Sequence, residues 1–198
     1  YESYLPSRKL YIPVDINAAV RNEMIYPTDT NVVDRIPIDL TDRQYITKDE
    51  LAVLDIIASN IWDRPIYFSV TCQESKLQGL QNFMQLEGLG LRIVPIKSRS
   101  DKNYYIYGSG RVDTKRTYET IVNEWKWGNF DKMDLYVNTS YMPAVQAMRM
   151  IMMRTSQVMI QDGQQDKAVE IVDKYFEGFP NMNFPYNATT VPIIGVYE

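Results

Sequence analysis

The sequence predicts an α/β protein: a small three-layer core of parallel strands and crossover helices, followed by an α-helical hairpin. Three observations lead to this fold class. Residues 47–95 have the pattern of a helix, a strand, a second helix and a second strand. Two further strand-like segments, 9–15 and 35–40, precede them. From residue 140 onward, apolar residues recur at helical spacing in two stretches with a glycine between them, which indicates a pair of helices.

The first helix of the central stretch has a clear beginning and a clear end. Thr47 and Glu50 have the spacing of a capping box, in which each side chain satisfies a backbone N–H of the first turn. Pro65 ends the helix, because the residue before a proline avoids the helical region. The apolar face of this helix carries Leu51, Leu54, Ala58 and Ile61.

The segment from Ile66 to Val70 is a short run of mostly apolar, β-forming residues, which is typical of a strand covered on both faces. Thr71 and Glu74 repeat the capping-box spacing and begin a second predicted helix, which Gly88 closes. Residues 91–96 form the next strand. Two strands joined by a helix of this length are parallel, with a right-handed crossover. We therefore expect this segment in the middle of the sheet, and the predicted architecture depends on that position.

The N-terminal part adds two strands and a short helix. Pro13 places the strand over residues 9–15 near an edge or an end of the sheet. Asp15 caps a short helix over residues 16–24. The strand over residues 35–40 leads into the helix that begins at Thr47, so the core has the order strand, helix, strand, helix, strand.

The chain beyond residue 96 changes from α/β to helical character. A polar loop at 97–103 precedes a predicted short strand, Tyr104 to Tyr107, and Asp113 with Thr114 begins a helix. One long amphipathic helix follows from residue 140 and stops at Gly163. A second helix covers residues 166–176, and the segment after residue 180 is predicted to be loop or partial strand. The predicted domains are an α/β core over 1–135, a helical hairpin over 136–180 that packs on the core or starts a repeat array, and a tail over 181–198.

Bulk composition excludes several classes of function. The 198 residues carry a formal net charge of −4 and no basic stripe, so we expect no nucleic-acid partner. No window of 18 apolar residues is present, so no transmembrane helix is predicted. The chain begins at Tyr1 without a methionine, and we expect it to be a fragment of a larger protein.

The absence of histidine and the single cysteine restrict the chemistry further. Without histidine, His-based triads, His general bases and His metal ligands are excluded. One cysteine, Cys72, permits neither an internal disulfide nor a cysteine cluster for a metal. We expect no metal and no cofactor. Cys72 itself follows the predicted strand at a helix start, where a thiol pKa can be lowered, and its alternative is a buried bystander.

Several strings along the chain resemble a known family. They are Trp62-x-Arg64-Pro65-Ile66-Tyr67-Phe68, Glu87-Gly88-Leu89 followed by Arg92-x-Val94-Pro95, Ile12-Pro13-Val14-Asp15, and the aromatic Trp-Gly-Asn segment at 125–129. These strings are similar to the C-terminal soluble region of a bacterial family of large multi-pass membrane proteins of unknown function. That family is related to the transmembrane protein O-mannosyltransferases. Residues 147–180 are similar to a tetratricopeptide-type helical hairpin, so the resemblance covers nearly the whole chain.

The resemblance implies a place and a role. It implies a location on the periplasmic side of the bacterial inner membrane, next to the membrane domain of a parent glycosyltransferase-like protein. It implies that the catalytic acid lies in the membrane part, so that this fragment is not catalytic itself. The implied function is that of an accessory domain, with the parent membrane domain and an acceptor protein or glycan as partners.

Three charged residues are candidates for binding. The Arg64 guanidinium precedes the predicted buried strand, where its fork can hold a carboxylate or a phosphate. The alternative is an internal ion pair of Arg64 with Asp55, Asp63 or Glu87. Glu87 and Arg92 flank the Gly88 turn, and their alternative is a pair with each other.

Aromatic residues give the second signal. The clusters Tyr104-Tyr105-x-Tyr107 and Trp125-x-Trp127 predict a stacking platform for sugar rings, with packing in the core as the alternative. No catalytic residue is assigned. The candidate binding residues are Trp62, Arg64, Tyr67, Glu87, Arg92, Trp125 and Trp127.

Two other functions remain open at this point. A protein-interaction scaffold is the first alternative, in which the helical hairpin continues into tetratricopeptide-like repeats. A free-standing carboxylate hydrolase that uses Asp63, Glu74 or Glu87 is the second, and it requires two carboxylates roughly 5–10 Å apart.

Overall fold

The structure is a computed structural model that describes residues 7–197. The chain forms two compact units. Unit 1 comprises Tyr1–Gln85 and Gly90–Arg111, and unit 2 comprises Leu86–Leu89 and Val112–Glu198. Helices and strands are both present and the C-terminal region is helical, so the predicted α/β mixture is confirmed. The domain limits predicted from the sequence stay a prediction.

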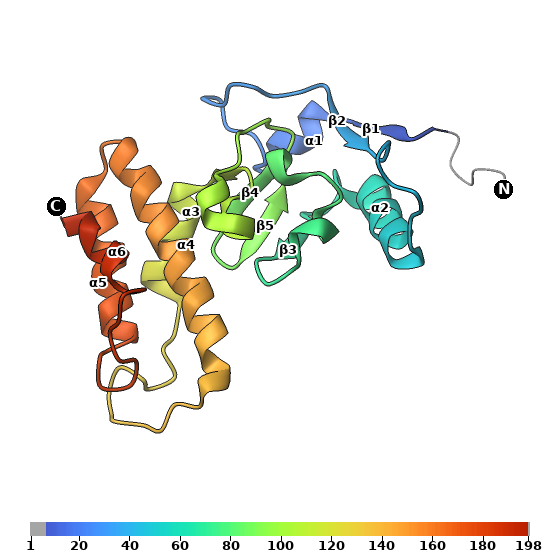
Figure 1. The fold of residues 1–198 in the computed structure, drawn as a ribbon. Helices are drawn as coiled ribbons and strands as arrows, with labels where there is room; N and C mark the ends of the chain where they lie inside the picture. Colours follow the sequence, from blue (N-terminus) through green and yellow to red (C-terminus); the bar gives the residue numbers. More distant parts are fainter. Residues whose placement is uncertain (1–6, 198) are drawn as a thin grey trace. The chain divides into compact units, whose positions relative to one another are not determined.

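Unit 1 contains short strands and two α-helices (Figure 1). Its elements are β1 (Lys9–Pro13), α1 (Ile16–Arg21), β2 (Arg35–Asp39), α2 (Lys48–Asn60), β3 (Tyr67–Ser69) and β5 (Gly90–Ile93). Three 3-10 turns complete it, at Glu74–Leu77, Gln81–Phe83 and Lys102–Gly108. Strands β4 (Met84–Glu87) and β6 (Arg111–Val112) each contain residues of both units.

The strands form two sheets. In the first, β1 and β2 pair antiparallel, from Lys9 opposite Asp39 to Pro13 opposite Arg35. The second has the order β3-β5-β4-β6, with β3 and β5 antiparallel. Neighbours β4 and β5 are joined by two residues, which is the connection of an antiparallel hairpin. Gly88 sits in this turn with φ 57°.

The predicted parallel unit with a crossover helix is therefore wrong. The predicted second helix is replaced by 3-10 turns at Glu74–Leu77 and Gln81–Phe83, because Gln78 and Gly79 between them adopt left-handed backbone, with φ 55° and φ 80°. The apolar spacing that suggested a helix is real, since Leu77, Leu80 and Phe83 are all buried. Consecutive 3-10 turns present every third residue on one side, and this spacing resembles a helical stripe.

The segment Ile66 to Val70 is likewise not covered on both faces. Strand β3 occupies the edge of its sheet, Tyr67 is 44% exposed and Ser69 is exposed. The predicted central position of this segment is wrong. An edge strand has one neighbour for its backbone, so its apolar residues do not require a buried sheet.

The other predicted elements of unit 1 are formed, apart from one. The Glu50 carboxylate accepts a hydrogen bond from the Thr47 backbone N–H at 3.1 Å at the start of α2. Asp15 caps α1 by accepting from the Ala18 N–H at 2.9 Å. The predicted strand at Tyr104 to Tyr107 is wrong, because the segment Lys102–Gly108 forms 3-10 turns.

Unit 2 is built on a helical hairpin (Figure 1). Helix α3 (Thr114–Glu119) continues into a π-helical turn (Thr120–Glu124), and the hairpin is α4 (Met142–Gln161) with α5 (Gln165–Gly178). The predicted helix pair is thus confirmed, and its tetratricopeptide character stays a prediction. A 3-10 turn at Thr139–Tyr141 precedes α4, while α6 (Val191–Ile194) and a 3-10 turn (Gly195–Tyr197) replace the predicted loop or partial strand of the tail. Glu198 lies outside the described residues.

The apolar face of the hairpin is buried by other segments of the same unit. The core includes Met152, Met159, Ala168, Ile171 and Val172 of the two helices. Residues that precede and follow the hairpin belong to the same cluster: Ile121, Phe179, Phe184, Ile193 and Val196. Other segments of unit 2 therefore cover the apolar face of the hairpin.

Candidate functional site

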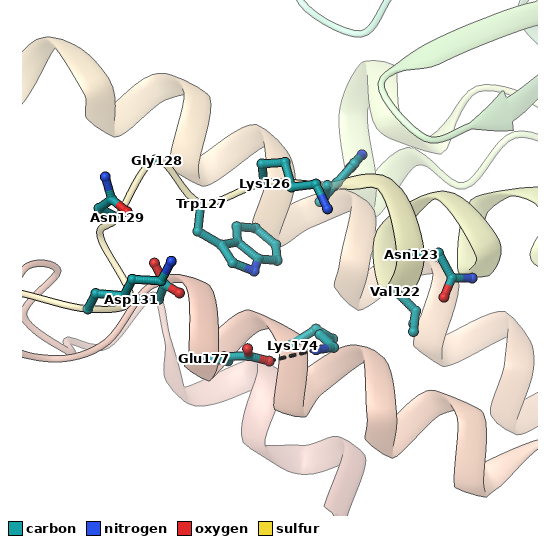
Figure 2. A pocket seen from close by; sticks show the side chains of 11 residues that line it. Val122, Asn123, Lys126, Trp127, Gly128, Asn129, Asp131, Lys174 and Glu177 are labelled. Atoms are coloured by element: carbon teal, nitrogen blue, oxygen red, sulfur yellow. Dashed lines mark hydrogen bonds and ion pairs between the residues drawn. The ribbon is translucent and has the colours of Figure 1, made fainter.

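A pocket of about 440 Å³ lies in unit 2, between the segment that follows the π-helical turn and helix α5 (Figure 2). Two of the predicted candidate residues, Trp125 and Trp127, line it. The complete lining is Val122, Asn123, Trp125, Lys126, Trp127, Gly128, Asn129, Asp131, Lys132, Lys174 and Glu177. Most of the wall therefore comes from one short stretch of chain.

Successive turns give that stretch its shape. The Trp125 N–H donates to the Thr120 carbonyl at 3.1 Å and closes the π-helical turn. Gly128 and Asn129 then adopt left-handed backbone, with φ 57° and φ 70°. Glycine and asparagine accept this conformation at the lowest steric cost, so the sequence Trp-Gly-Asn favours a reversal here.

The Trp127 indole is fixed by three contacts. Its ring meets Trp125 edge to face at 6.1 Å between centroids and meets Phe179 edge to face at 5.3 Å. It also lies directly on Gly178, where a Cβ atom would come within 2.3 Å of a ring carbon. Figure 2 shows the indole pointing across the pocket toward α5, where Lys174 and Glu177 lie. The ring is therefore held before any ligand arrives.

Polar groups surround this ring. Lys174 and Glu177 form an ion pair at 2.7 Å on α5. Asn123 and Asn129 contribute amides, and both side chains are exposed. An amphipathic ring beside amide and charged groups suits a ligand with an apolar face and several hydroxyl groups, because amides and charged side chains donate to and accept from hydroxyls.

Three of the other candidate residues make contacts within unit 1. The Trp62 indole N–H donates to the Pro13 carbonyl at 2.9 Å. Arg92 is 2% exposed and donates to the Asn22 carbonyl at 2.6 Å, so it satisfies the C-terminal end of α1. Its guanidinium also lies 5.9 Å from the centroid of the Tyr67 ring. Each of these contacts ties one element of unit 1 to another.

The two remaining candidates differ in their surroundings. Glu87 pairs with Arg116 at 3.4 Å, and its side chain is 7% exposed. Arg64 is exposed, and within residues 7–197 we find no ion pair for it, so the alternative pairing with Asp55, Asp63 or Glu87 is not formed there. Binding roles for Trp62, Arg64, Tyr67, Glu87 and Arg92 stay a prediction.

Sequence reasoning missed the polar lining of the pocket. Lys126 stands between the two tryptophans, and the alternation Trp-Lys-Trp was a usable signal that the segment is partly exposed. Lys174 and Glu177 are three residues apart on a helix, which is the spacing of an ion pair on one face. Nothing in the sequence placed this face opposite Trp127, because that contact depends on how α5 packs.

The described residues offer no obvious place for a metal or a membrane span. No group of three or more acidic or cysteine side chains within residues 7–197 is arranged to hold a metal ion. None of the helices in that range has the length and apolar character needed to cross a membrane. Cys72 is a free, half-buried thiol.

Comparison with protein families adds a relationship. The family model for TMEM260-associated domain 2 matches residues 1–116. The chain belongs to this family. No curated protein matches the chain, and no solved structure matches it. Membership of TMEM260-associated domain 2 makes the chain a domain that accompanies a membrane protein of the TMEM260 type, which confirms the coarse part of the predicted relationship. The match ends within α3, so the pocket lies beyond the matched residues.

Proposed function

We propose that this chain is a non-catalytic accessory domain of a glycosyltransferase-like membrane protein, and that its unit 2 pocket binds a glycan of the acceptor. We place the domain on the periplasmic side of the bacterial inner membrane, beside the parent membrane domain. Membership of TMEM260-associated domain 2 supports the association with a membrane protein. The relation to O-mannosyltransferases, suggested by the sequence motifs, supports the glycan as ligand.

One observation carries the glycan assignment: the Trp127 ring is fixed in a pocket that is lined mostly by polar side chains. The apolar C–H face of a sugar ring packs on an aromatic face, and its hydroxyls then reach the amides of Asn123 and Asn129 and the charged pair on α5. A fixed ring loses little conformational entropy on binding, which favours recognition of a weakly apolar ligand.

The experiment titrates the 198-residue chain with methyl α-mannoside, methyl α-glucoside and an N-acetylglucosamine disaccharide. The backbone amide signals of Gly128 and Lys174, two other lining residues, report binding in NMR spectra of the chain and of every variant. We expect a saturable shift with at least one sugar and a loss of affinity of about tenfold in Trp127→Ala. Tyr45→Ala is the matched control, because it removes an exposed aromatic ring of unit 1 that does not line the pocket.

Trp127→Ala also opens the core, so Asn123→Ala serves as a second variant that leaves the packing intact. It should weaken the same sugar without lowering the thermal midpoint. No saturable shift with any of the three sugars, or an equal loss in Tyr45→Ala, would overturn the glycan assignment. Sugar transfer from a lipid-linked donor by this chain alone would overturn the non-catalytic role.

The scaffold alternative is less well supported by the geometry. A repeat array needs an apolar hairpin face for the next repeat. In unit 2, α3 with its π-helical turn and the segment from Phe179 to Val196 already contribute to the core of the hairpin. The hydrolase alternative meets a different obstacle, because Arg116 pairs with the Glu87 carboxylate.

A further inference from the structure

A second depression, of about 520 Å³, lies in unit 1 and shares no lining residue with the glycan pocket. We call it the basic groove. Two extended segments and one residue of a 3-10 turn form it. Its lining is Asn31, Val32, Val33, Asn82, Lys97, Ser98 and Arg99.

Backbone hydrogen bonds hold the walls of the basic groove in place. The Val33 N–H donates to the Pro95 carbonyl at 2.9 Å, and the Lys97 N–H donates to the Asn31 carbonyl at 3.1 Å. These two bonds flank the antiparallel bridge between Val32 and Ile96. The Ser98 N–H donates to the Asn82 carbonyl at 2.8 Å and attaches the turn to the same wall. The groove is therefore part of the folded framework of unit 1.

The charge of the lining is one-sided. Lys97 and Arg99 are exposed cations, and the remaining lining residues are neutral, so no carboxylate lines the groove. The whole chain carries a net charge of −4, so this local charge has the opposite sign to that of the chain as a whole. Two cations that face one space repel each other, and an anion between them removes that repulsion.

Hydrogen bonds orient the Asn82 amide toward an acceptor. The Ser100 hydroxyl accepts from the Gly110 N–H at 3.1 Å, so its own proton goes to the Asn82 side-chain oxygen at 3.0 Å. The Asn82 carbonyl oxygen is thereby engaged, and its NH₂ group is the part that remains to serve a ligand. The groove presents donors of three kinds: an ammonium, a guanidinium and an amide.

We propose that the basic groove binds the phosphate group of a phosphate ester. The Arg99 guanidinium takes two phosphate oxygens in a fork, and the Lys97 ammonium acts as a point charge on the third. The Asn82 amide and the Ser98 hydroxyl donate to the remaining lone pairs. Val32 and Val33 supply apolar surface for the carbon that carries the ester oxygen. The headgroup of phosphatidic acid and a soluble phosphate monoester present the same group with three terminal oxygens, and the experiment separates them.

The experiment records NMR amide spectra of the 198-residue chain during titration with inorganic phosphate and with glycerol 3-phosphate, at constant ionic strength. We expect saturable shifts at Val32, Ser98 and the Asn82 side-chain amide. The double variant Lys97→Gln/Arg99→Gln should weaken binding at least about tenfold. The matched control is Arg21→Gln/Lys48→Gln, which removes two exposed cations of unit 1 outside the groove and should leave the affinity unchanged.

Vesicles identify the source of the phosphate. Co-sedimentation with phosphatidylcholine vesicles that contain phosphatidic acid, lost only in Lys97→Gln/Arg99→Gln, assigns the group to a lipid headgroup. Shifts with glycerol 3-phosphate but no co-sedimentation assign it to a soluble ester. The proposal is overturned if chloride produces the same shifts at the same ionic strength, if phosphate produces none, or if both double variants lose binding equally.

Discussion

The two units stabilise themselves by different means. Unit 2 centres on aromatic rings: Phe179 contacts Trp127, Tyr175 and Phe184 at centroid distances of 5.3, 5.4 and 5.1 Å. Unit 1 has a mostly aliphatic interior, and polar side chains connect its short elements. Arg111 reaches both Asp29 and Gln85, and Arg92 reaches the end of α1. Aromatic rings can shift against each other by small amounts, whereas atoms that pack directly against the backbone have no such freedom. The same kind of substitution should therefore cost more in unit 1.

Glycine substitutions test this difference most directly. In unit 1, a Cβ atom at Gly110 would lie 1.8 Å from the Met84 carbonyl oxygen, and φ at Gly110 is +60°. We expect Gly110→Ala to lower the free energy of unfolding by about 3 kcal/mol or more, because clash and backbone strain add. Hydrogen exchange of peptides from residues 84–111 and urea denaturation measure the loss.

Gly79→Ala is the control for that variant. Gly79 also has a positive φ, +80°, but no atom lies within 4 Å of a Cβ placed there. It should lose about 1–2 kcal/mol from backbone strain alone. Equal losses at the two positions would show that close backbone approach does not distinguish Gly110, and the comparison between the units would lose its main support.

Gly178 gives the corresponding test in unit 2, with a smaller expected effect. A Cβ atom there would meet the Trp127 ring at 2.3 Å, and the ring can move where a carbonyl cannot. We expect Gly178→Ala to cost about 1–3 kcal/mol and to change tryptophan fluorescence as the ring is displaced. Helix propensity alone predicts the opposite sign, since alanine is favoured over glycine in a helix by about 1 kcal/mol. Gly195→Ala, with open space around it, should be neutral.

The sequence was most informative where elements are long. Helices α4 and α5 have 20 and 14 residues, so their apolar stripes repeat often enough to be recognised. Helix α2 was also correct at its start, because a capping box is a local signal. The predicted buried face of α2 was partly wrong: Ile57 is buried, whereas Ala58 is exposed. An apolar stripe in the sequence therefore identifies the buried face of a helix only to within about one residue.

The central stretch contains structures that the sequence alone could not predict. Residues 71–93 contain two 3-10 turns, of four and three residues, and a hairpin of two four-residue strands, and none of these repeats a pattern often enough to identify it. Left-handed backbone at Gln78, a non-glycine residue, has no strong sequence signal. The predicted relationship depended on motif residues, and the family match confirmed its coarse part, although the architecture drawn from the same residues was wrong.

The residues of the candidate site also fall into two groups, those with a local sequence signal and those without one. Trp125 and Trp127 were identified because their side chains carry a recognisable chemistry. The α5 face opposite them was not, because the contact between residues 127 and 178 depends on tertiary packing. The basic groove likewise joins residues 31–33, 82 and 97–99, which no local pattern connects.

The smallest expected effect is a difference in pH response between the units. In unit 1, the hydrogen bond from the Thr47 backbone N–H is the largest cause that lowers the pKa of Glu50, and the charge of Arg43 lowers this pKa further. A lowered carboxyl pKa gives stability that is present above about pH 4.5, the ordinary pKa of the group, and is lost as the pH falls through the lowered value. In unit 2, burial first and the Asp173 carboxylate second raise the pKa of Tyr197 to about 12.

A raised tyrosine pKa has the opposite sign. Its contribution is fully present below about pH 10, the ordinary value, and is lost as the pH rises through about 12. Tyr197→Phe should cost less than about 1 kcal/mol at pH 7, because a partly exposed hydrogen bond contributes little. It should also remove one late-titrating phenolate from the ultraviolet absorbance curve and flatten the alkaline loss of stability measured by hydrogen exchange of α5. Glu50→Gln should flatten the acid limb in α2 and leave the alkaline limb unchanged. If Tyr197→Phe altered neither the absorbance curve above pH 10 nor the exchange of α5, the bond to Asp173 would not hold the C-terminal turn on the hairpin.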